Sequence, residues 1–231
     1  MEKTLASLGL LLATVLARGS CLTCETCISP GEGCNGLAHP CSPNEDTCLT
    51  LIGENSLGGG DTTETLKTCI AAADCYAGSI SISTGAGVQI RSISRCCQDD
   101  LCNQWALNQR VLRDDVTSER RHCTGHIVPP LNLNPNSLRC PVCFAFESNH
   151  CEGNETLACT GVDNHCVSVS GTLNIAGHLS PFAARGCGTA TACTLPLGVG
   201  LYSAGVIFTL DKVLCSPAPN AGSRGKKLSQ G

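Results

Sequence analysis

The chain has 231 residues and a formal net charge of −4, and 20 residues are cysteine while only 3% are aromatic. This mild negative charge argues against nucleic acid or an anionic membrane as a partner. Because so few large side chains bury little apolar area, disulfides are expected to provide most of the stability, as in small extracellular proteins.

The N-terminus has the layout of a secretory signal peptide. Glu2 and Lys3 precede an apolar run at residues 8–16, and small residues follow. Cleavage after Gly19 and cleavage after Cys21 both agree with this layout. We expect a signal peptide over residues 1–21, so that Cys21 is lost and the secreted chain begins at Leu22.

One cysteine spacing then occurs twice. It runs C-x2-C-x6-C-x6-C-x6-C-x20-C-x5-C over residues 24–75 and C-x2-C-x7-C-x7-C-x6-C-x20-C-x5-C over residues 140–193. Seven positions recur in register, which indicates two homologous modules. We expect module 1 at 22–103, a linker at 104–139, module 2 at 140–215 and a polar tail at 216–231.

The long gaps of module 1 predict β-hairpins. A short hairpin is expected over residues 27–41, and a longer one rises at 49–52 to a glycine-rich tip and returns over 62–68. In the last hairpin Ile80 and Ile82 share a face, and residues 84–87 supply the turn.

The segment 104–123 departs from this pattern, being charged and holding the single tryptophan, Trp105. A solvated linker or an oddity of the gene model explains it more simply than an added binding helix. Cys123 has no partner in the repeated spacing. With Cys21 removed it is a free thiol or forms an intermolecular bridge, and with Cys21 kept the two could pair.

Module 2 repeats the plan, with strands at 167–170 and 182–185 and a last hairpin that includes 206–208. The apolar stretch 195–210 contains Pro196 and several glycines, so it predicts two strands rather than a membrane span. Asn154 begins the single N-x-S/T glycosylation sequon. The polar, basic end has no lipid-anchor signal, and the product is expected to be soluble and secreted.

The closing string of module 1, CCQDDLCN at residues 96–103, resembles the signature of the lymphocyte-antigen-6 and urokinase-receptor family. The resemblance implies an all-β, disulfide-rich fold of two tandem three-finger modules. In module 1 it implies the pairs Cys24–Cys48, Cys27–Cys34, Cys41–Cys69, Cys75–Cys96 and Cys97–Cys102. In module 2 it implies Cys140–Cys166, Cys143–Cys151, Cys159–Cys187 and Cys193–Cys215. A fifth bridge is missing there, which leaves the closure of module 2 open.

A ten-cysteine module followed by an eight-cysteine one, with the segments 24–27, 164–171 and 185–187, is similar to gamma-type phospholipase A2 inhibitors of snake plasma and their mammalian relatives. This resemblance covers residues 21–103 and 124–215. It implies a secreted protein that binds a secreted phospholipase A2 and blocks its access to lipid, without a cofactor. The alternatives are a modulator of a cell-surface receptor and an adhesion or fertility-type protein released from its anchor. Partner contacts are expected at the finger tips 54–61 and 173–181.

Catalysis and metal binding are not expected. The cysteine-rich string 96–102 superficially resembles the active-site motif C-C-x-x-H-x-x-C of secreted phospholipases A2. It contains no histidine, so the general base for lipid hydrolysis is absent. With the cysteines oxidised, the histidines offer no zinc-site spacing. They are His39, His122, His126, His150, His165 and His178.

Overall fold

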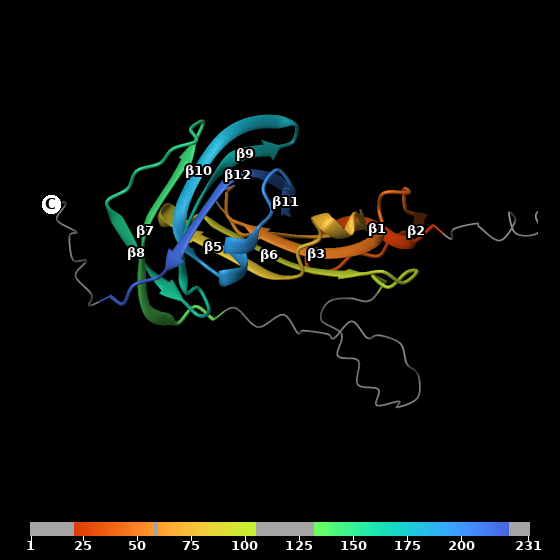
Figure 1. The fold of residues 1–231 in the computed structure, drawn as a ribbon, viewed down its shortest axis with the longest axis horizontal. Helices are drawn as coiled ribbons and strands as arrows, with labels where there is room; N and C mark the ends of the chain where they lie inside the picture. The colour runs from red at the N-terminus through yellow and green to blue at the C-terminus, as the bar shows by residue number, and fades with distance from the viewer. Residues whose placement is uncertain (1–20, 58–59, 105–131, 222–231) are drawn as a thin grey trace, which may run out of the picture.

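The computed structural model describes residues 21–57, 60–104 and 132–221. Within these ranges the regular structure is β-strand, apart from three short 3-10 turns (Figure 1). The turns are η1 (Ala72–Asp74), η2 (Gly85–Gly87) and η3 (Ala190–Thr194). The predicted all-β class is therefore confirmed. No helix in this part of the chain is long and apolar enough to cross a membrane.

Module 1 contains three antiparallel hairpins, β1 with β2, β3 with β4 and β5 with β6, which correspond to the three expected fingers. Ile80 and Ile82 are both buried, as the alternation predicts. The strands are β1 (Thr23–Pro30), β2 (Leu37–Pro40), β3 (Thr47–Asn55), β4 (Thr62–Ile70), β5 (Gly78–Thr84) and β6 (Gln89–Cys97).

Module 2 repeats this plan with strands that are longer except for β11, and the two strands expected between residues 195 and 210 are present as β11 and β12. Its first strand begins at Pro135, inside the stretch 104–139 that was expected to be linker. The reason is that residues just before Cys140 pair both with β8 and with the chain after Cys215. The strands are β7 (Pro135–Phe146), β8 (Glu155–Thr160), β9 (His165–Ile175), β10 (His178–Gly188), β11 (Gly200–Ser203) and β12 (Val206–Pro217).

The two modules share one continuous sheet. Its main path runs β11-β12-β9-β10-β5-β6-β3-β4-β1-β2, and β7 and β8 branch from β10 (Figure 1). The modules join where β10 pairs with β5, with Gly186 opposite Thr84 and Cys187 opposite Ser83. A Cβ atom at Gly186 would overlap the carbonyl oxygen of Ser83, so this close approach requires glycine.

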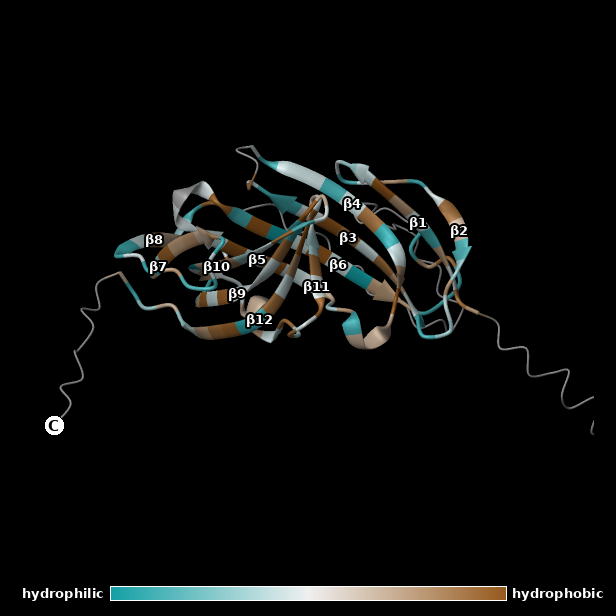
Figure 2. Cartoon of the chain, turned by 90° about the horizontal axis from the view of Figure 1, so that it is seen from above, coloured by the Kyte–Doolittle hydropathy of each residue, from teal (hydrophilic) through white to brown (hydrophobic). Residues whose placement is uncertain are grey.

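The main hydrophobic core is also shared. Ile80, Ile82 and Ile90 of module 1 pack with residues of module 2 such as Phe182 and Phe208, whose rings meet edge to face at 5.4 Å. Alternating hydrophobic and hydrophilic residues along the strands produce this one-sided burial (Figure 2). Two further clusters consist of buried cysteines, one in each module. Disulfides therefore take up core positions that apolar side chains occupy in larger domains.

Candidate functional site

The base of each module is held by disulfides, nine in the described residues. In module 1 they are Cys24–Cys48, Cys27–Cys34, Cys41–Cys69, Cys75–Cys96 and Cys97–Cys102. In module 2 they are Cys140–Cys166, Cys143–Cys151, Cys159–Cys187 and Cys193–Cys215. These are the pairs that the family resemblance implied.

Three cysteine sulfurs gather closely in each module base, as in a metal site. They are those of Cys24, Cys41 and Cys69, and those of Cys140, Cys159 and Cys187. Every one of these sulfurs is already in a disulfide. Because a metal ion needs a free thiolate, the two clusters are structural.

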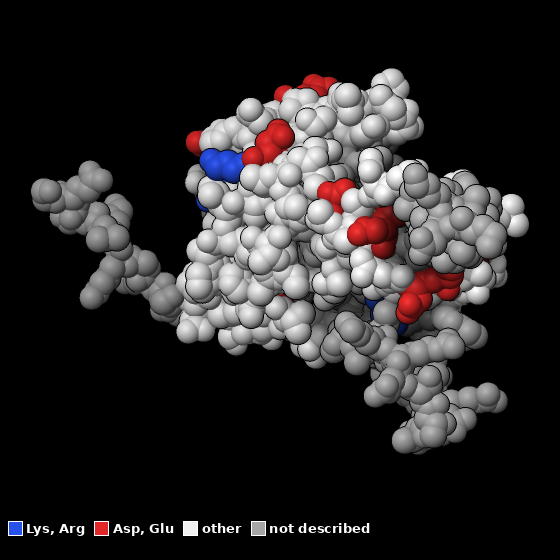
Figure 3. Space-filling view, turned by 45° about the vertical axis from the view of Figure 1, so that its right-hand side comes forward, with Lys and Arg blue, Asp and Glu red and all other residues white. Residues whose placement is uncertain are grey.

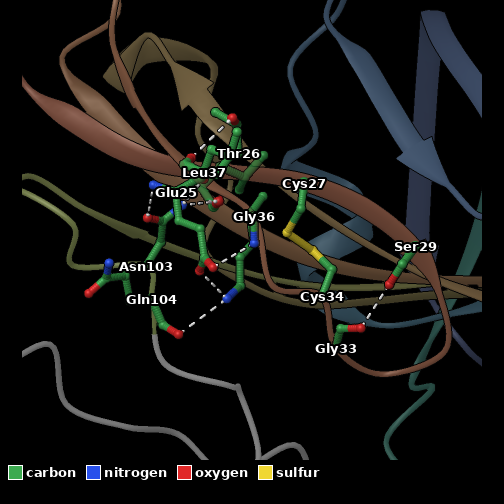
Figure 4. A network of polar contacts seen from close by, with 12 residues as sticks. Glu25, Thr26, Cys27, Ser29, Gly33, Cys34, Gly36, Leu37, Asn103 and Gln104 are labelled. Atoms are coloured by element: carbon green, nitrogen blue, oxygen red, sulfur yellow. Dashed lines mark hydrogen bonds and ion pairs between the residues drawn. A yellow bond between two sulfur atoms is a disulfide. The ribbon is translucent and has the colours of Figure 1, made fainter.

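Asn103 closes module 1 from inside (Figure 4). Its Oδ1 accepts the Glu25 N–H at 2.8 Å, and its Nδ2 donates to the carbonyl oxygens of Glu25 and Leu49 at 2.9 and 3.2 Å. The Glu25 carboxylate in turn accepts the Gly36 N–H and forms a buried ion pair with Lys67, with Nζ and Oε2 2.6 Å apart. This network ties the C-terminal end of the module to its first two fingers.

Module 2 closes without the fifth bridge. The Arg139 N–H donates to Pro219 O at 3.0 Å and the Ala221 N–H to Ser137 O at 2.9 Å, with an isolated β-bridge between Leu138 and Asn220. The chain after Cys215 is thus held by backbone hydrogen bonds to the start of β7. These bonds close module 2 in place of the fifth disulfide.

The two expected finger tips differ in accessibility. In the tip 54–61, Asn55 is 4% exposed, and its Nδ2 donates to the carbonyl oxygens of Ser203 and Ala204 at 2.5 and 3.1 Å. A Cβ atom at Gly53 would lie 2.6 Å from Ser203 Cα, so the strands are in close contact here. The expectation of a free contact surface is therefore wrong for Asn55, because module 2 covers it. In the tip 173–181, by contrast, Leu179 is 71% exposed.

Beyond this second tip, module 2 presents a free face of its sheet, formed by β9, β10 and β12. Burial alternates along β9 and along the first part of β12, so one side faces the core and the other faces solvent. Directly paired residues share a face. From tip to base the rows are Leu179–Asn174–Ile207, Pro181–Thr172–Thr209, Ala183–Ser170–Lys212 and Arg185–Ser168–Leu214. We call these twelve residues the outer face of module 2, and Ala183 is the one member that is buried, at 4% exposed.

The outer face combines exposed apolar side chains with two cations. Leu214 and Ile207 are 54% and 40% exposed, and Lys212 and Arg185 lie in the two rows nearest the base. Exposed apolar side chains on a rigid sheet are typical of protein-binding surfaces. On the face drawn in Figure 3, carboxylates lie in separate small groups and basic side chains cover only small areas.

The groups with altered pKa values lie at the junction of the modules. Burial raises the pKa of Asp163, whose carboxylate accepts the Ser81 hydroxyl of module 1. Burial and a hydrogen bond to Glu64 raise the pKa of Tyr202 to about 12, and burial raises that of Tyr76 to about 12. These values follow from packing between modules, and none of the three groups is hydrogen-bonded to a histidine.

The remaining sequence-predicted residues lie apart from one another. Cys21 is exposed and unpaired, whereas Cys123 and Trp105 lie outside the described residues. Asn154 is exposed, as its sequon requires. The histidines of the described part, at positions 39, 150, 165 and 178, sit on different strands and loops, and those at 122 and 126 lie outside it.

Comparison with known proteins gives the family. Residues 22–104 match the model described as phospholipase A2 inhibitor, and residues 136–216 match the u-PAR/Ly-6 domain. The chain is 32% identical over 213 residues to a phospholipase A2 inhibitor gamma subunit of Gloydius brevicaudus siniticus, covering 90% of this chain and 92% of that protein. The chain belongs to the phospholipase A2 inhibitor family. It is also 30% identical over 185 residues to the phospholipase A2 inhibitor NAI of Notechis ater, covering 80% and 82% of the two chains.

Among solved structures, that of mouse TEX101 matches 86% of this chain and 99% of its own length, at 18% identity and a TM-score of 0.32, too low to support a comparison of details.

The phospholipase A2 inhibitor family consists of binding proteins rather than enzymes, so its functional site is a surface. Sequence reasoning singled out the tip that contains Leu179 as a place for partner contacts, but it did not single out Ile207, Lys212 or Leu214. The alternation along the first part of β12 was a signal for Ile207, whereas Lys212 and Leu214 reach this face only because a bulge between Leu210 and Lys212 shifts the register.

Proposed function

We propose that this chain is a secreted protein that inhibits a secreted phospholipase A2 by direct protein–protein contact. The observation that carries the proposal is the alignment with inhibitors named for this enzyme, which covers 92% of one relative and spans both modules. The cysteine register, the continuous sheet and the closing network of module 1 give such an inhibitor a rigid body.

We infer that the outer face of module 2 is the contact surface. Leu179 and Ile207 lie in one row at the tip and offer apolar side chains that a partner can bury. Because disulfides and sheet pairing already hold the strands, binding costs little ordering entropy. A partner bound to this face buries part of its own surface in the complex. If the partner is an enzyme that acts at a lipid interface, it is inhibited when the buried part includes its lipid-facing side.

The test compares two exposed apolar sites of the same protein. The purified chain should slow the hydrolysis of micellar lipid by at least one secreted phospholipase A2, in proportion to the complex formed. The double variant L179S/I207S should weaken inhibition at least about ten-fold, because a few side chains buried on binding usually carry most of the binding energy of an interface. Leu37→Ser, on β2 of module 1, is the matched control, since Leu37 is 81% exposed and lies far from this row along the sheet.

Reduction and alkylation should abolish inhibition, because each small module depends on its bridges for stability. The chain alone should not hydrolyse lipid. A survey of secreted phospholipases A2 with a correctly bridged sample that found no partner would refute the proposal. Equal loss in L37S and L179S/I207S would refute the choice of surface but not the function.

A second candidate function is modulation of a cell-surface receptor. It is favoured by the match of module 2 to the general u-PAR/Ly-6 domain, while the inhibitor model matches module 1. Specific, saturable binding to cells by a chain that binds none of the phospholipases surveyed would support this second function.

We also propose that residues 1–21 are a signal peptide, that residues 22–103 and 140–215 are the modules, that residues 104–139 join them and end in the start of β7, and that Asn154 carries a glycan. Asn154 and Thr156 are both exposed, which gives the glycosylation machinery access to the sequon. N-terminal sequencing of the secreted chain tests the first statement. A glycosidase-sensitive mass shift that is lost in Asn154→Gln tests the last.

A further inference from the structure

A hollow lies at the base of the outer face of module 2. It has a volume of about 230 Å³ and is lined by residues of β9, β10 and β12 and by the loop between β7 and β8. Ser168, Ser170 and Ala183 supply small side chains beneath it, and Lys212 borders it on β12. The loop residues 149–151 border it on the other side, and the Cys143–Cys151 disulfide holds that loop in place.

Most of the hydrogen-bond donors that line the hollow have no partner; the exception is His150, whose ring nitrogen lies 3.1 Å from the exposed Glu152 carboxylate. In the part of the chain that the structure describes, Arg185 and Lys212 form no ion pair, and the side chains of Ser168, Ser170 and Asn149 form no hydrogen bond. The lining contains no aspartate or glutamate. An anionic ligand supplies acceptors for these donors, and the two cations among them favour such a ligand over a neutral one.

The placement of charge within module 2 supports this interpretation. Between residues 132 and 221 there are three Lys or Arg residues against five Asp or Glu residues, and two of the three cations line this hollow. The third cation, Arg139, is exposed on β7 and donates to the Thr156 hydroxyl. An acidic protein that brings its few cations together creates a local site for negative charge.

The size and surroundings of the hollow indicate what the anion belongs to. Its volume lies below the roughly 300–1,000 Å³ typical of small-molecule pockets, so it suits single side chains better than a whole metabolite. A long polyanion would meet the net charge of −4 of the whole chain and only three cations in the described part of this module. A short acidic stretch of a protein avoids both problems, and it can also cover the exposed Leu214 at the rim.

We propose that this hollow binds carboxylate side chains from an acidic segment of a protein partner. Arg185 and Lys212 supply the charge, and Ser168 and Ser170 donate from beneath. The hollow belongs to the outer face that we infer to be the phospholipase contact surface, but its test needs neither an enzyme nor lipid, so the two proposals can fail separately.

The test titrates the full-length, isotope-labelled protein with the peptide hexaglutamate and follows backbone amide shifts. Shifts should concentrate at residues 168, 170, 185 and 212, and hexaglutamine should produce none. K212Q should weaken peptide affinity about three-fold and R185Q/K212Q about ten-fold, as expected for partly exposed charged contacts. R139Q removes the same charge outside the hollow and should leave the affinity within about two-fold. Lys212 is exposed, so K212Q keeps the test decisive if the change at Arg185 disturbs the sheet.

Three outcomes would overturn the proposal. The first is the absence of shifts at these four positions with hexaglutamate. The second is an equal loss of affinity in R139Q and K212Q, which would mean that only overall charge matters. The third is binding of inorganic sulfate or a heparin oligosaccharide in the hollow with no binding of hexaglutamate, which would assign it to another class of anion.

Discussion

Asn103→Ala should lower the free energy of unfolding of module 1 by more than the lost packing of this small side chain accounts for. Asn103 is 3% exposed and makes three hydrogen bonds, one with the Glu25 N–H and two with the carbonyl oxygens of Glu25 and Leu49. Each such bond contributes about 1 kcal/mol net, and a buried backbone group left without a partner costs about 1–3 kcal/mol. The expected loss in the free energy of unfolding is therefore about 3–5 kcal/mol.

The assay is urea unfolding with disulfides intact, combined with hydrogen exchange of the Glu25 amide. That amide should exchange faster in Asn103→Ala, because its acceptor is gone. The control is Asn174→Ala at the tip of module 2, where Oδ1 accepts a single N–H, that of Gly177 at 2.9 Å in an exposed turn. It should cost no more than about 1 kcal/mol. Equal losses in the two variants, with unchanged exchange at Glu25, would refute the closing role of Asn103.

Three further predictions concern pH and cysteine chemistry. Burial raises the pKa of Asp163 above its ordinary value of 3.8, so its contribution to stability is complete below that pH and is lost as the pH rises through the raised value. In urea unfolding at a series of pH values, Asp163→Asn should remove this part of the pH dependence of the free energy of unfolding. If the free energies of the two proteins plotted against pH ran parallel, the prediction would be contradicted. If Cys21 is lost with the signal peptide, the secreted chain should begin at Leu22. Cys123 should then appear as one titratable thiol or as the link of a disulfide-bonded dimer. A monomer that begins at Ser20 and has no free thiol would instead indicate a Cys21–Cys123 bridge. Non-reducing peptide mapping should recover two linkages, Cys75–Cys96 and Cys97–Cys102, and a Cys96–Cys102 linkage would show the pairing to be wrong.

Much of the fold could be predicted from local signals in the chain. The repeated cysteine spacing indicated two modules, and the alternation around Ile80 and Ile82 indicated a hairpin that the structure contains. The scarcity of aromatic residues indicated stability from disulfides, and buried cysteines do form a core cluster in each module. Each of these inferences depends on residues close together in the chain or on a spacing that occurs twice.

How the modules meet, and which surface stays free, depends on contacts between residues that are far apart in the chain. The sequence alone determined the modules, the hairpins and the faces of single strands, because periodicity is a property of neighbouring residues. The pairing of β5 with β10, the burial of Asn55 against Ser203 and the meeting of Arg185 with Lys212 join residues far apart in the chain. No local pattern encodes these contacts, since they depend on how the strands of both modules line up once their apolar faces are buried together.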